Sequence, residues 1–103
     1  MPPRIIQFTT TAGKAYEDTS FVTGDSPRVI EVEDDLANKI GQAGWFINDG
    51  PGDIQVAIQN NEQSVYSDAF TTKSGEMYQL NGLNIRRVRL TWVANSAYRF
   101  FIS

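Results

Sequence analysis

Two groups of charged side chains could do chemistry in this 103-residue chain. The acidic group is Glu31, Glu33, Asp34 and Asp35, and the basic group is Arg86, Arg87, Arg89 and Arg99. Clustered carboxylates are ligands for Ca²⁺, but the spacing here does not match the EF-hand loop. Guanidinium forks bind carboxylates and phosphates and are enriched at protein interfaces. We therefore expect a partner protein to contact Glu31, Glu33, Arg87, Arg89 and Arg99. Alternatively, the arginines pair within the chain with Glu31, Glu33 or Asp68.

The residue types needed for most catalysis are missing. The chain has no histidine, the usual general base and commonest transition-metal ligand, and no cysteine. Ser-His-Asp catalysis and zinc hydrolysis are therefore excluded. Asp49 and Asp53 flank a turn, which explains them better than glycoside hydrolysis does, because a domain this small has little room for a substrate cleft. We expect a non-enzymatic protein with no cofactor and no metal.

Length and composition describe an ordinary small globular chain. One domain fits the length, and 41% apolar with 20% charged residues argues against disorder. The net charge of −3 argues against a nucleic-acid partner. No run is long and apolar enough to span a membrane, and the N-terminus lacks the apolar core of a signal peptide. We expect a soluble chain made in the cytoplasm, with no membrane partner.

The residues from 84 to 103 have the clearest strand pattern. Val88, Leu90 and Trp92 alternate with polar residues, and the row Tyr98, Phe100 and Ile102 follows after a turn at Asn95 and Ser96. The pattern predicts two strands paired as a hairpin, with both apolar rows facing the core.

A second hairpin is predicted between residues 44 and 60. The sequence DGPGD has turn chemistry and separates GWFIN from IQVAIQN. Alternation in the second strand places Ile54, Val56 and Ile58 inward and Gln55, Ala57 and Gln59 outward. A phosphate-binding loop is not expected, because the lysine and the following helix of a P-loop are absent.

Further short strands are predicted at 28–33, 64–71 and 76–80, with one helical turn within 34–42, where Leu36 and Ile40 are four residues apart. Strands that recur about every 8 to 12 residues are typical of a sandwich or barrel. We therefore predict an all-β fold: a single β-sandwich, jelly-roll or immunoglobulin-like, of about seven or eight antiparallel strands.

The N-terminal residues 1–27 are predicted to form an extended arm or edge segment, and residues 28–103 the sandwich domain. Residues 14–22 could be either a strand of the sandwich or an extended segment on a partner. A short strand is predicted at Arg4, Ile5, Ile6, Gln7 and Phe8. We expect these five residues to pair with an exposed sheet edge of a neighbour.

Aromatic residues leave a second interpretation open. Exposed rings can stack on sugars, and the orientation of Trp45, Tyr66 and Tyr78 is not fixed by the strand pattern. If the three rings share one exposed face, a carbohydrate-binding or receptor-binding module is favoured.

After Phe70, the sequence KSGEMYQLNGLNIRRVRLTWVANSAYRFFIS resembles small accessory virion proteins of tailed bacteriophages, of the capsid decoration or cement type. With the segment GWFINDGPGDIQVAIQN, the resemblance covers residues 44–103. It implies a β-sandwich located in the virion that binds the major capsid protein or another virion protein and forms homo-oligomers. A tail or head–tail adaptor component is a related alternative.

Overall fold

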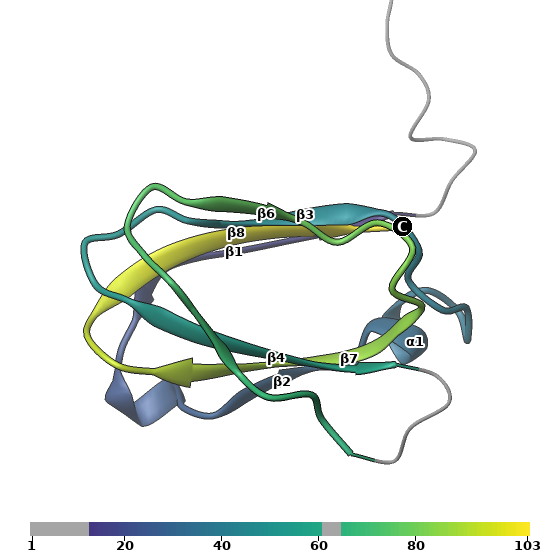
Figure 1. Ribbon diagram of the computed structural model, residues 1–103, viewed down its shortest axis with the longest axis horizontal. Helices are drawn as coiled ribbons and strands as arrows, with labels where there is room; N and C mark the ends of the chain where they lie inside the picture. The colour runs from purple at the N-terminus through teal and green to yellow at the C-terminus, as the bar shows by residue number, and fades with distance from the viewer. Residues whose placement is uncertain (1–12, 61–64) are drawn as a thin grey trace, which may run out of the picture.

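The computed structural model describes residues 13–60 and 65–103, which form two antiparallel four-stranded sheets packed face to face (Figure 1). Sheet A has the order β1 (Lys14–Phe21), β8 (Ser96–Ile102), β3 (Gly44–Asn48) and β6 (Met77–Gln79). Sheet B has the order β2 (Arg28–Ile30), β7 (Ile85–Trp92), β4 (Ile54–Asn60) and β5 (Phe70–Thr72). The predicted arm contacts Arg4, Ile5, Ile6, Gln7 and Phe8 lie outside the described residues.

The strand pairing is that of a jelly roll. β1 pairs with β8, β2 with β7, β3 with β6 and β4 with β5, so the chain is folded as one long double ribbon. Rolling this ribbon gives two Greek keys, which is the jelly-roll arrangement. The predicted all-β sandwich is confirmed, and of the two predicted types the pairing selects the jelly roll.

Both predicted hairpins are wrong. β7 and β8 lie in different sheets, and so do β3 and β4. Their connections arch from one sheet to the other, so the two apolar rows face each other across the core instead of pairing side by side. The same turn residues and the same alternation serve a hairpin and an arch equally well, which is why the sequence pattern does not separate them.

The core lies between the sheets and is rich in aromatic rings. Phe46 stacks on Tyr98 with ring centroids 5.6 Å apart, and Phe21 meets Tyr98 edge-on at 5.7 Å. Each such ring removes roughly 150 to 250 Å² from water, which makes these contacts the main source of stability. Most of the predicted inward side chains are buried: Ile30, Val32, Ile54, Val56, Val88, Leu90, Tyr98, Phe100 and Ile102.

Strand β4 departs from the predicted alternation near its end. Ala57 and Gln59 are buried although they face outward, and Ile58 is only half-buried although it faces inward. Arg89 pairs with Ala57 across the strands and lies over Tyr66, so these two large side chains cover the small one. Ile58 keeps some exposure because the sandwich opens at that edge, as described below.

The N-terminal part of the described chain is integral to the sandwich. Of the two options for residues 14–22, the structure shows the strand: β1 is the edge strand of sheet A and pairs with β8 from Lys14 to Phe21. The predicted arm or edge segment 1–27 thus includes an edge strand. α1 spans Val32–Asp35, two residues earlier than predicted, because Val32 and Leu36 form the buried pair of this turn.

Candidate functional site

The acidic run and two of the arginines meet where α1 lies beside the start of β7. β2 pairs with β7 and leads directly into α1, so the acids that follow β2 lie beside the start of β7. Arg87 donates from Nε to Glu31 (2.7 Å), and Arg86 donates from Nε to Glu33 (3.1 Å). The hydrogen bond with Glu31 raises the pKa of Arg87. The two charge signs are thus paired within the chain, as the alternative interpretation predicted.

Arg89 and Arg99 do not belong to one basic face. Arg89 lies on sheet B with its guanidinium 4.4 Å from the ring centroid of Tyr66. Arg99 lies on the outside of sheet A and donates from Nε and Nη2 to the two carboxylate oxygens of Asp49, each at 2.9 Å. The expected surface of Arg87, Arg89 and Arg99 is therefore divided, because the chain changes sheets between β7 and β8.

The three rings that could have formed a sugar platform point to different places. Trp45 lies on the outside of sheet A and stacks on Phe101, with ring centroids 6.1 Å apart. Tyr66 lies under Arg89 at sheet B, and Tyr78 packs against Phe70 between the sheets, with ring centroids 5.2 Å apart. The arrangement that would have favoured a carbohydrate-binding module is therefore absent.

A polar cluster that the sequence pattern did not reveal closes the edge between β1 and β2. Arg28 Nη1 donates to Asp18 and to the hydroxyl of Tyr98 (3.0 Å), and Arg28 Nη2 lies 3.5 Å from Asp25. Burial raises the pKa of Tyr98, and the hydrogen bond from Arg28 partly offsets this rise. Nearby, Tyr16 donates to Asp35 (2.5 Å), and burial together with that bond raises the pKa of Tyr16.

The cluster predicts a pH dependence of stability carried by Asp18. Burial alone would raise its pKa, but hydrogen bonds from the Ser20 N–H and from Arg28 outweigh burial and hold the pKa below its usual value of 3.8. The contribution of the ionised Asp18 to the free energy of unfolding is therefore fully present above its unfolded-state pKa. This contribution is lost as the pH falls through the folded-state pKa. In urea unfolding, Asp18→Asn should be less stable than the wild type at pH 7, and this difference should shrink toward about pH 2. A difference independent of pH would contradict this assignment.

These charged groups are used in contacts within the fold. Within residues 13–60 and 65–103, no three acidic side chains lie close enough together to share a metal ion. Glu31, Glu33 and Asp35 each have a partner within the chain.

A more distinctive surface is the outer face of sheet A. Trp45, Ile47 and Met77 point outward there, and Ile47 and Met77 are direct partners across β3 and β6. Trp45 and Ile47 are half-buried, whereas Met77 is 53% exposed. The outward residues of a β-sandwich are normally polar, so an apolar group of this kind is a candidate contact surface. We call Trp45, Ile47 and Met77 the sheet A apolar face.

A second apolar feature is a groove where the sandwich opens between β5 and β6. Two hollows of about 340 and 370 Å³ share Ile58 and Leu83. The first is also lined by Val65, which is 64% exposed, and the second by Phe70 and Tyr78. We call these joined hollows the β5–β6 groove.

The opposite end of the sandwich is held by a buried amide that sequence reasoning missed. Asn48 ends β3 and is fully buried. Its Nδ2 donates to the carbonyls of Gly52 (2.9 Å) and Thr72 (2.8 Å), and its Oδ1 accepts from the Gly50 N–H (2.7 Å) and the Ser96 hydroxyl (2.8 Å). One side chain therefore connects the β3–β4 arch, β5 and β8.

No helix among the described residues is long and apolar enough to cross a membrane. No protein-family model matches the chain, and a search among curated proteins found no match. A solved structure titled "Crystal structure of PirA" is similar with a TM-score of 0.39 and 18% identity, covering 87% of this chain and 82% of that one. A likeness at this level carries no argument, so the fold assignment depends on the strand pairing alone.

Proposed function

We propose that this protein is a non-enzymatic structural component of a tailed-bacteriophage virion. It decorates or cements the capsid by contacts with the major capsid protein or another virion protein. A tail or head–tail adaptor position would use the same kind of contact with a different symmetry. The sequence resemblance between residues 44 and 103 motivates the proposal, and jelly rolls are common in viral capsid proteins.

The observation that carries the proposal is the sheet A apolar face. Trp45, Ile47 and Met77 form an outward apolar group on an antiparallel sheet, and the ion pair of Arg99 with Asp49 lies beside it, because Arg99 is the cross-strand partner of Ile47. An apolar centre with a charged border is the usual anatomy of a protein interface. By contrast, Arg86 and Arg87 of β7 are already paired with Glu33 and Glu31, and Arg89 lies over Tyr66. We therefore assign partner contact to sheet A rather than to the arginines of sheet B.

The virion role is tested by composition. Phage particles purified by density gradient from the culture that carries the coding sequence should contain the chain, in a fixed ratio to the major capsid protein measured by peptide mass spectrometry. Particles that contain every other structural protein but lack this chain would overturn the proposal.

The contact surface is tested by Met77→Lys, with Val29→Lys as the matched control. Both side chains are exposed apolar residues at strand positions, 53% and 42% exposed, on sheet A and sheet B respectively. Neither change should alter the free energy of unfolding by more than about 0.5 kcal/mol. We expect Met77→Lys to reduce incorporation into particles about tenfold or more, because a buried unpaired charge is costly at an interface. Equal incorporation of both variants would contradict the assignment to sheet A.

A further inference from the structure

We infer that the β5–β6 groove is the docking site for the N-terminal segment, residues 4–8, of a second copy of this chain. This contact belongs to the assembly role proposed above. Its test detects contact between two copies in solution, without any virion. The docking inference and the virion proposal can therefore fail independently of each other.

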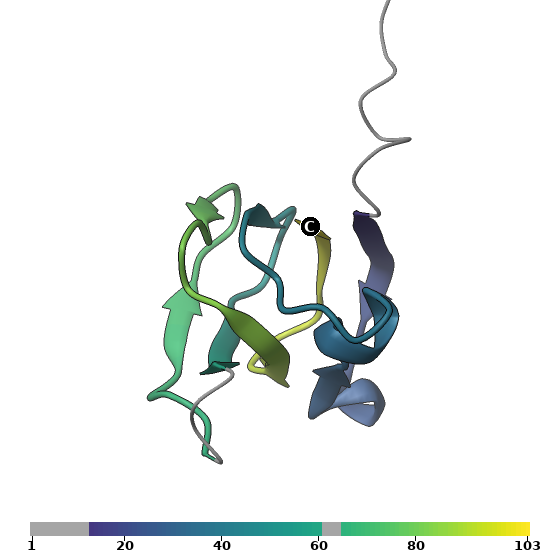
Figure 2. The ribbon, with the colours of Figure 1, turned by 90° about the vertical axis from the view of Figure 1, so that its right-hand side faces the viewer.

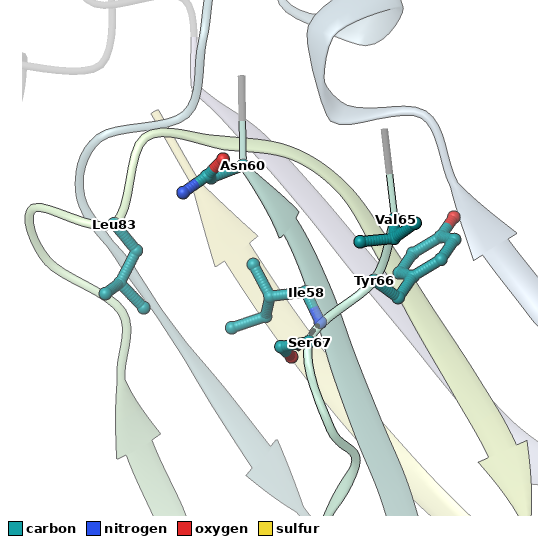
Figure 3. Close-up of a pocket in the computed structure, with 6 residues that line it drawn as sticks. All are labelled: Ile58, Asn60, Val65, Tyr66, Ser67 and Leu83. Atoms are coloured by element: carbon teal, nitrogen blue, oxygen red, sulfur yellow. Dashed lines mark hydrogen bonds between the residues drawn. The ribbon is translucent and has the colours of Figure 1, made fainter. Parts of the chain in front are cut away.

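The groove has the shape and chemistry of a receptor for a short apolar segment. Figure 3 shows Ile58 at its floor, between Leu83 on one side and Val65 on the other. Leu83 is 43% exposed and Val65 is 64% exposed. Two aliphatic side chains beside one groove are thus left in contact with water, which is unfavourable compared with burial. The second hollow extends this surface to Phe70 and Tyr78, so apolar side chains line its length. Together the hollows provide pockets for more than one side chain.

The sequence of residues 4–8 complements this surface. Arg4, Ile5, Ile6, Gln7 and Phe8 combine three apolar side chains with a cation, and residues 1–12 contain no acid. Two exposed acids border the groove: Asp68 follows Ser67, which lines the first hollow, and Glu76 accepts a hydrogen bond from Tyr78 (2.8 Å), which lines the second. Apolar side chains can therefore fill the hollows while Arg4 lies near a carboxylate.

The geometry assigns the segment to a second copy and not to its own chain. Residue 13 leads into β1, which is one edge strand of sheet A, whereas β6 and the groove lie at the opposite edge. Figure 2 shows β1 and the β5–β6 side at opposite sides of the molecule. Between these two edges the end of the sandwich is crossed by backbone, where the Gly41 N–H donates to the Ile85 carbonyl and the Gln42 N–H to the Ser103 carbonyl. We therefore assign the groove to the segment of a neighbouring copy.

Site-directed cross-linking tests this contact, because the chain has no cysteine of its own. Single-cysteine variants Ile6→Cys and Leu83→Cys, one carrying a mass tag, are mixed in solution and oxidised. In the matched control, Ile6→Cys is mixed with Val93→Cys in place of Leu83→Cys, because Leu83 and Val93 are both 43% exposed. Docking raises the effective concentration of the two thiols, so the tagged heterodimer should form at least about tenfold faster with Leu83→Cys than with Val93→Cys.

Two outcomes would overturn the inference. Equal cross-linking rates for the two mixtures would show that the groove does not hold the segment. A disulfide that forms in the double variant Ile6→Cys/Leu83→Cys only within one chain would show that the occupant is the chain's own segment. As an independent measurement, Leu83→Asp should lower the solution mass found by light scattering, whereas Val93→Asp should leave it unchanged.

Discussion

Replacing the buried amide in Asn48→Ala should lower the free energy of unfolding by about 3 kcal/mol or more, since each buried group left without a partner costs about 1 to 3 kcal/mol. The substitution leaves the carbonyls of Gly52 and Thr72 without their donor and the Gly50 N–H without its acceptor. These groups lie in a part of the molecule where water does not replace the amide, because Asn48 is fully buried. The expected result is a protein that folds marginally or not at all at 37 °C.

Urea unfolding followed by tryptophan fluorescence measures this loss, and Asn81→Ala is the matched control. Asn81 is exposed and accepts a single hydrogen bond, from the Gly44 N–H (3.2 Å). Its removal should cost less than about 1 kcal/mol, because water can replace the lost partner. If the two variants lost the same stability, the buried amide would not be the connection that holds this end of the sandwich.

The alternation of apolar residues predicted the inner and outer faces of the longest strands correctly. Val88 and Leu90 of β7, and Tyr98 and Phe100 of β8, are buried as the period of two requires. What alternation cannot supply is the partner of each strand, because an apolar row looks the same whether its partner lies beside it or across the core. The assignment of β7 and β8 to different sheets therefore needed the structure.

The candidate site was predictable only where sequence neighbours stay neighbours in space. The interpretation that the arginines pair with Glu31 and Glu33 is confirmed for Arg87 and Arg86, because β2 and β7 are adjacent and α1 follows β2 directly. Arg99 shares only its charge with them, and the change of sheet between β7 and β8 separates it. The role of Asn48 had one available signal: an asparagine two residues before the glycine of a Gly-Pro-Gly turn can bond that turn's backbone.

The sheet A apolar face depends on a glycine that permits close contact of two backbones. Gly44 pairs with Ile102, and a Cβ at this position would lie 2.0 Å from the Phe101 carbonyl oxygen and 2.9 Å from Ile102 Cα. Backbone atoms cannot rotate away as a flexible side chain can, so β3 would have to move from β8. We expect Gly44→Ala to lower the free energy of unfolding by about 3 kcal/mol, the upper part of the usual range for overpacking.

The matched control is Gly24→Ala, because a Cβ at Gly24 would meet no heavy atom within 4 Å. At a site with free space and a permissive backbone, alanine stabilises by up to about 1 kcal/mol through the unfolded chain. The two substitutions therefore change the free energy of unfolding in opposite directions, and urea unfolding measures both changes. Trp45 directly follows Gly44 and lies on the sheet A apolar face, so any folded fraction of Gly44→Ala should also be incorporated poorly into particles. A Gly44→Ala protein as stable as the wild type would show that β3 and β8 can move apart without cost. The close contact at Gly44 would then not fix the position of the sheet A apolar face.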